Sequence, residues 1–176
     1  MNKSIKFKNN IYLDTSSIVH STRILNELLT PNYMMIGKTV EPLRWSTQDT
    51  WQPMDFKTKI TSFGNKLIHD GNGIRIGSGV SKVRVVAQIL YDVSGLDAST
   101  NYLFMRISNN NIGKSKSITG MHRWGTLHTE AIFNVSEDDI IKCDVLKSTN
   151  KEISFYDYTQ NFGAGSGCYL IVEVIE

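Results

Sequence analysis

Two histidines and one glutamate form the cluster that resembles a metal site: His122, His128 and Glu130. Imidazole nitrogens and carboxylate oxygens are common zinc ligands. Side chains alternate between the two faces of a strand, so His128 and Glu130 would share the outward face of a strand over Leu127–Val135. The third ligand has no assigned position. We therefore interpret these residues as solvated polar groups and predict no metal and no other cofactor.

Three acidic residues, Glu137, Asp138 and Asp139, lie together between two predicted strands. Paired carboxylates can hydrolyse glycosidic bonds, but short polar side chains are also typical of turns. The sequence contains no Gly-x-Ser-x-Gly nucleophile motif. The glycine-rich run at 163–167 precedes a strand, whereas a phosphate loop precedes a helix. The sequence therefore predicts a protein that is not an enzyme.

The best candidate for a binding element is a short connection that contains His122, Arg123 and Trp124. A tryptophan ring can stack on the apolar face of a sugar while the cation and the imidazole bind hydroxyl groups. The alternative is that Trp124 anchors the core or an interface. A second candidate consists of two tyrosines, Tyr156 and Tyr158.

Short strands must position these residues, because alternating apolar segments separated by turn residues fill most of the chain. The turn Asp70-Gly71-Asn72-Gly73 joins two of them as a hairpin. The predicted strands cover 59–63, 66–69, 73–77, 82–91, 101–107, 112–118, 127–135, 140–146, 152–158 and 167–175. Evenly spaced short strands of this kind predict an all-β antiparallel sandwich or barrel.

The first 43 residues have a different pattern. Ile5–Lys8 and Ile11–Leu13 alternate around two asparagines, which predicts a small hairpin. A helix is expected from Ser16 or Ser17 to Pro31, with an apolar side that packs on its own domain or on copies of itself. That apolar side comprises Ile18, Leu25, Leu28 and Leu29.

The pattern breaks at Pro31 and Pro42, so we place a domain boundary there. Residues 1–43 form an N-terminal attachment or trimerisation segment, and residues 44–176 form the main domain. Trp45 and Trp51 are expected to pack the linker onto the sandwich.

Composition narrows the classes of partner. Nineteen basic and 17 acidic residues give a net charge of +2 and are interspersed, so we expect no nucleic-acid partner. Residues 1–8 lack the apolar core of a secretory signal, and no apolar run is long enough to span a membrane. We expect synthesis in the cytoplasm without membrane insertion. Cys143 and Cys168 fit no disulfide or zinc spacing, and we interpret them as buried free thiols.

Three motifs resemble the jelly roll of the C1q and tumour necrosis factor superfamily. They are the glycine-rich step at 74–80 before the strand at 83–89, the acidic turn at 135–141, and the segment Phe162–Ile171. Asp138 departs from the family pattern, which favours glycine there. The resemblance covers roughly residues 58–176 and implies a ten-stranded jelly-roll sandwich that forms a homotrimer around one face.

Two predicted strands are apolar on both faces, which favours a buried outer surface. Tyr102 and Phe104 point outward from one, and Tyr169 and Ile171 from the other. The resemblance implies that these strands are neighbours in one sheet and that the four residues form one patch at the trimer axis. The alternative is that loops or the N-terminal segment cover them.

The same mapping places Cys143 and Cys168 on strands separated by the strand at 101–107. The thiols would then lie roughly 9 to 10 Å apart, which is beyond disulfide reach.

The opening residues 5–20 are similar to those of short phage tail and baseplate proteins of Gram-positive hosts. This resemblance implies a virion protein that is synthesised in the bacterial cytoplasm. The protein would be a receptor-binding or structural homotrimeric head that contacts other tail proteins and recognises a host cell-surface saccharide or protein. The alternative functions are a carbohydrate-active enzyme or a single-chain carbohydrate-binding module that acts on cell-surface polysaccharide. A third is a purely structural virion component.

Overall fold

The computed structural model describes residues 5–6, 12–13, 31–37, 43–45, 49–92, 102–120, 124–149, 153–155 and 167–176. The chain divides into two units, Met1–Pro31 and Asn32–Glu176. In the first unit, β1 (Ile5–Lys6) pairs antiparallel with β2 (Tyr12–Leu13), which confirms the predicted hairpin. The expected helix lies outside the described residues.

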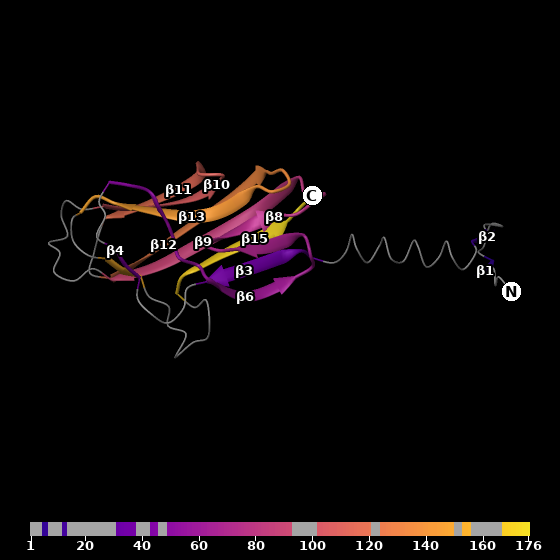
Figure 1. The fold of residues 1–176 in the computed structure, drawn as a ribbon, viewed down its shortest axis with the longest axis horizontal. Helices are drawn as coiled ribbons and strands as arrows, with labels where there is room; N and C mark the ends of the chain where they lie inside the picture. Colours follow the sequence, from indigo (N-terminus) through magenta and orange to yellow (C-terminus); the bar gives the residue numbers. More distant parts are fainter. Residues whose placement is uncertain are drawn as a thin grey trace. The chain divides into compact units, whose positions relative to one another are not determined.

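The second unit is an antiparallel sandwich of two sheets, with β10, β11 and β13 in one layer over β9, β15, β3 and β6 (Figure 1). The six-stranded sheet has the order β11-β10-β13-β8-β7, and β5 also pairs with β13. Its strands are β5 (Gln52–Pro53), β7 (Leu67–Asp70), β8 (Gly73–Ile76), β10 (Tyr102–Asn109), β11 (Ile112–Gly120) and β13 (Ile140–Lys147).

The seven-stranded sheet has the order β4-β14-β9-β15-β3-β6, and β12 also pairs with β9. Its strands are β3 (Tyr33–Gly37), β4 (Leu43–Trp45), β6 (Thr58–Phe63), β9 (Lys82–Asp92), β12 (Trp124–Asn134), β14 (Ile153–Phe155) and β15 (Tyr169–Val174). The expected all-β antiparallel sandwich is confirmed.

Each of the ten predicted segments contains a strand, and three further strands join the sheets. The sequence analysis did not predict β3, β4 or β5. β3 is a short apolar run, and periodicity alone does not identify such runs as strands. It pairs with β15 on one side and β6 on the other, so residues 33–37 belong to the sandwich. The division between units falls between Pro31 and Asn32, whereas the sequence analysis placed its boundary after residue 43.

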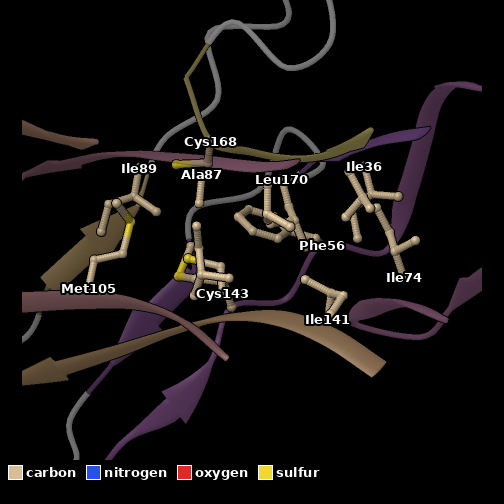
Figure 2. Packing of buried hydrophobic residues seen from close by; sticks show 14 of the residues in the cluster. Ile36, Phe56, Ile74, Ala87, Ile89, Met105, Ile141, Cys143, Cys168 and Leu170 are labelled. Atoms are coloured by element: carbon tan, nitrogen blue, oxygen red, sulfur yellow. The ribbon is translucent and has the colours of Figure 1, made fainter. Parts of the chain in front are cut away.

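The core lies between the two sheets and is formed by alternate residues of each strand. On β9, every second residue from Val83 to Tyr91 is almost fully buried. Figure 2 shows Ala87, Ile89 and Leu170 of the seven-stranded sheet facing Ile141 and Met105 of the six-stranded sheet. Phe56, from the segment between β5 and β6, fills the space between the two sheets and is completely buried (Figure 2). The alternation that predicted the strands therefore also determines which residues form the core.

The turn between β12 and β13 is joined to the turn between β10 and β11 through Asp139. Asn109 Nδ2 and Asn110 Nδ2 each donate to this carboxylate at 2.7 Å, and the Ser136 amide donates at 2.9 Å. Asp138 beside it has φ +66°, a conformation that glycine adopts most easily. Asp138 therefore adopts a left-handed backbone conformation at the position where the resembled family favours glycine.

We expect the Asp139 carboxylate to make the stability of the fold depend on pH. Burial raises the pKa of Asp139, but the hydrogen bonds from Asn109, Ser136 and Asn110 outweigh burial and hold the pKa below its ordinary value of 3.8. The group therefore stabilises the fold above the unfolded-state pKa, and this contribution is lost as pH falls through the folded-state pKa.

The variant Asp139→Asn should have a lower free energy of unfolding than wild type at pH 7. The difference from wild type should shrink as the pH is lowered below about 4. Urea unfolding of both proteins across this pH range measures the difference in free energy of unfolding. Glu137→Gln, which removes an exposed carboxylate two residues away, is the matched control. A difference that stays constant with pH would show that the charge of Asp139 does not contribute.

Cys143 and Cys168 are completely buried thiols that form no disulfide in the described part of the chain, which confirms their interpretation. Their predicted placement is wrong, because the two cysteines lie on opposite sheets. Cys143 is in β13 of the six-stranded sheet, and Cys168 directly precedes β15 of the seven-stranded sheet (Figure 2). The two cysteines are therefore separated by the core between the sheets and not by a strand within one sheet.

Both thiols should resist modification in the folded protein. Burial, followed by the charges of Asp144 and Cys168, raises the pKa of Cys143 well above its ordinary value. Since only thiolates react rapidly with disulfide reagents, we expect no release of chromophore from Ellman's reagent under native conditions. Two equivalents of chromophore per chain should be released after unfolding in urea. Rapid native reaction of either thiol would contradict the burial described here.

Candidate functional site

The structure describes little of the predicted binding elements. His122, Arg123, Tyr156 and Tyr158 lie outside the described residues. Trp124 begins β12 and pairs with Asp92 of β9, so its backbone belongs to a strand and not to a loop. The saccharide site at these residues stays a prediction.

The outward face of the seven-stranded sheet carries a broad set of half-buried apolar side chains. Val86 of β9 pairs with Ile171 of β15, which in turn pairs with Met35 of β3. Tyr169 lies in the adjacent row and donates its hydroxyl to Gln88 Oε1 at 3.3 Å. Each of these side chains is only partly exposed although it points away from the core. The central part of this sheet, over β9, β15 and β3, is therefore apolar on both faces.

Charged groups occupy one end of the same face. Arg84 Nε donates to Glu130 Oε1 at 2.7 Å, and its Nη1 lies 3.5 Å from Glu173 Oε2. The hydrogen bond from Arg84 lowers the pKa of the Glu130 carboxyl, and the hydrogen bond to Glu130 raises the pKa of the Arg84 guanidinium. One exposed guanidinium therefore contacts two carboxylates.

The predicted strand faces near His128 are confirmed, because His128 and Glu130 are exposed while Leu127 and Thr129 are buried. The Glu130 carboxylate forms an ion pair with Arg84. Within the described ranges, no group of three or more His, Cys, Asp or Glu side chains is arranged to hold a metal ion.

The outward face of the six-stranded sheet carries a second, more exposed set of apolar side chains, which we call the apolar patch. In one row, Phe104 of β10 lies between Ile118 of β11 and Leu146 of β13. Tyr102 is next to Phe104, with ring centroids 6.3 Å apart and ring planes inclined by 46°. Ile118 is 57% exposed and Tyr102 is 46% exposed. The patch consists of Trp51, Tyr102, Phe104, Ile118 and Leu146.

The predicted neighbourhood of the interface residues is wrong. Tyr102 and Phe104 are in β10 of the six-stranded sheet, whereas Tyr169 and Ile171 are in β15 of the seven-stranded sheet. All four point outward as predicted, but from opposite sheets of the sandwich, so they form two separate surfaces. The alternation within each strand is local and was visible in the sequence, whereas strand order depends on pairing between distant segments.

Sequence reasoning missed a buried ion pair beside the apolar patch. Arg106 Nε donates to Asp144 Oδ2 at 2.8 Å, and the two side chains are 16% and 5% exposed. The guanidinium lies 4.4 Å from the ring centroid of Trp51 and also donates to the Asn111 carbonyl. Trp51 therefore packs onto the sandwich, as expected. The sequence shows that an arginine and an aspartate are present on two predicted strands. That they form a pair follows only from the register between β10 and β13.

No helix in the described part of the chain has the length and apolar character needed to cross a membrane.

Comparison with known proteins supports the fold. No family model and no curated protein sequence matches this chain. A structure of murine APRIL at pH 8.0 matches with a TM-score of 0.58 at 11% identity, covering 82% of this chain and 99% of that chain. A structure of Eiger TNF from S. frugiperda matches with a TM-score of 0.56 at 11% identity, covering 84% of this chain and 94% of that chain. The chain therefore has a TNF-like jelly-roll fold.

Proposed function

We propose that this protein is a non-enzymatic, homotrimeric head of a phage tail or prophage-derived device that recognises a host cell-surface saccharide or protein. The observation that carries self-association is the apolar outward face of the seven-stranded sheet. Tyr169 and Ile171 belong to this interface in the proposal, together with Val86 and Met35. Tyr102 and Phe104 do not, because they lie on the other sheet.

Physical reasoning favours a second copy of the chain on this face. An antiparallel sandwich needs only its inner faces to be apolar, and solvent-facing positions are normally polar. Here the central row of the face contains Val86, Ile171 and Met35, with the Arg84 ion pairs beside them. An apolar centre with a polar edge is the usual composition of a protein interface. The C1q and TNF superfamily, which the sequence resembles, assembles as trimers around one face of the sandwich.

The recognition role rests on the sequence around His122, Arg123 and Trp124 and on the resemblance of residues 5–20 to phage tail proteins. In a trimer, each weak site would be present three times. Simultaneous binding to a cell surface would then raise the overall affinity through avidity.

Light scattering on the intact chain at two concentrations tests the assembly. A mass three times that of the chain at both concentrations is the expected result, and a monomer at both would contradict the proposal. Pull-down of host cell-wall fractions by the trimer, compared with an Arg123→Ala/Trp124→Ala variant, then tests recognition. Equal binding by both proteins would favour the purely structural virion component. A monomer that binds polysaccharide would favour the single-chain carbohydrate module.

A further inference from the structure

Met35 differs from the other methionines that the structure describes. Met34, Met54 and Met105 are buried in the core, with at most 4% of each residue exposed. Met35 lies on the outward face of the seven-stranded sheet and is half-buried. Because it follows Met34 directly in β3, the alternation of the strand sends one thioether into the core and the other outward. The chain's other two methionines lie outside the described residues.

The neighbours of Met35 are the central residues of the face that we assign to the trimer. β3 lies between β15 and β6 (Figure 1). Met35 pairs with Ile171 on one side and with the exposed Thr61 on the other, and Ile171 pairs in turn with Val86. Methionine is enriched at protein interfaces, where its flexible side chain adapts to the partner surface. Met35 therefore completes the apolar row beside β6.

A thioether at such a position has a characteristic reaction with peroxides. The peroxide O–O bond breaks, one oxygen atom forms a new bond to sulfur, and the other oxygen of hydrogen peroxide leaves as water. The sulfur loses two electrons and the peroxide gains them, so no further reactant is needed. Unlike the oxidation of a thiol, this step requires no prior loss of a proton. The product, methionine sulfoxide, is polar, and its oxygen accepts hydrogen bonds.

The sulfoxide has different consequences in the free chain and in the proposed trimer. In the free chain its oxygen is at the surface, where water binds it. In the trimer it would face an apolar surface, and burying a polar group away from water costs free energy. The polar side chains beside Met35 on this face are Thr61 and Lys59 of β6, and both are exposed. A hydrogen bond from either is equally available in the free chain, so neither favours the trimer.

We propose that Met35 is an oxidation site for peroxides and that its conversion to the sulfoxide prevents assembly through the seven-stranded sheet. The proposal rests on the proposed function, because the trimer is the state that oxidation opposes. Assembly covers Met35, so the reaction takes place on free chains, before they assemble or after they dissociate. The two processes therefore exclude each other by linkage. Methionine sulfoxide reductase, which removes the oxygen, reverses the block.

Peptide mass spectrometry after timed exposure to hydrogen peroxide tests the site. Ile171→Glu, which we expect to be a folded monomer, supplies the free chain. Its Met35 should be oxidised at least about tenfold faster than the three core methionines. Fragment ions that separate Met34 from Met35 locate the oxygen. If Ile171→Glu does not fold, Val86→Glu in the same row replaces it. Equal rates at all four methionines would overturn the proposal.

Light scattering during prolonged peroxide treatment of the wild type tests the effect on assembly. Each chain that dissociates is oxidised and does not reassociate, so the mass should fall in step with the sulfoxide content of Met35. Methionine sulfoxide reductase with a thiol reductant should restore the mass. Met35→Leu, which has no thioether at this position, should have the same mass before and after treatment. Met35→Gln, which carries a permanent polar group, should assemble at least about tenfold more weakly than the wild type.

The outcomes separate this inference from the proposed trimer. An oxidised wild type that keeps its trimeric mass, or Met35→Gln that assembles as tightly as the wild type, overturns the role of Met35 and leaves the trimer standing. An equal loss of mass in peroxide-treated Met35→Leu also overturns it, because another residue is then responsible. An untreated wild type that is a monomer contradicts the proposed trimer and, with it, the effect of oxidation on assembly.

Discussion

Replacing Ile171 with glutamate is expected to convert the proposed trimer to a folded monomer. Ile171 lies between Val86 and Met35 in the central row of the outward face of the seven-stranded sheet. In a monomer the new carboxylate points into water. In the proposed trimer it is buried without a cationic partner, because Arg84 already binds Glu130 and Glu173.

The expected size of this effect follows from the cost of burying a charge. An unpaired ion in an interface costs roughly 3 kcal/mol or more, and each trimer would contain three of them. Light scattering at micromolar concentration should therefore show the mass of a single chain. Circular dichroism should show unchanged strand content, because the side chain does not enter the core.

The matched control is Ile118→Glu, which places the same charge on the outward face of the six-stranded sheet. Ile118 is 57% exposed, so this variant should keep the mass of the proposed trimer. If Ile118→Glu dissociates the assembly and Ile171→Glu does not, the trimer forms through the other sheet.

Replacing Asp144 with alanine should give the largest loss of stability among single changes on the six-stranded sheet. The Asp144 side chain is 5% exposed and accepts a hydrogen bond from Arg106. Its removal leaves a guanidinium that is only 16% exposed without its carboxylate. The free energy of unfolding should fall by about 3 kcal/mol, the range found when one partner of a buried ion pair is deleted.

Urea unfolding at a fixed protein concentration measures this loss, because assembly of the proposed trimer would make stability depend on concentration. A double-mutant cycle with Arg106→Ala separates the interaction of the pair from the loss of either side chain. We expect the double variant to be more stable than the sum of the two single losses predicts. Strictly additive losses would show that the two groups do not interact in solution. Fluorescence of Trp51 should also change in Asp144→Ala, because Arg106 lies against its ring.

The sequence by itself determined most of the strands, their faces and many of the turns, although β3, β4 and β5 were not predicted. These properties depend on residues close together in the chain, since alternation of side chains decides which face is apolar. It correctly separated Leu103, Met105 and Ile107, all buried, from Tyr102 and Phe104 on the opposite face. It also identified the two thiols as free, because their spacing fits neither a zinc site nor a disulfide framework.

The tertiary structure alone decided which strands are neighbours. β10 could have paired in either sheet on its local pattern, and the prediction placed it beside β15, whereas it pairs with β11 and β13. The short strand β3 joined the sandwich through pairing with β15, more than 130 residues further along the chain. Arg106 and Asp144, 38 residues apart, met because of the register between β10 and β13. Contacts of this kind depend on the packing and pairing of distant segments, so a local pattern identifies the faces of a strand but not what lies beside it.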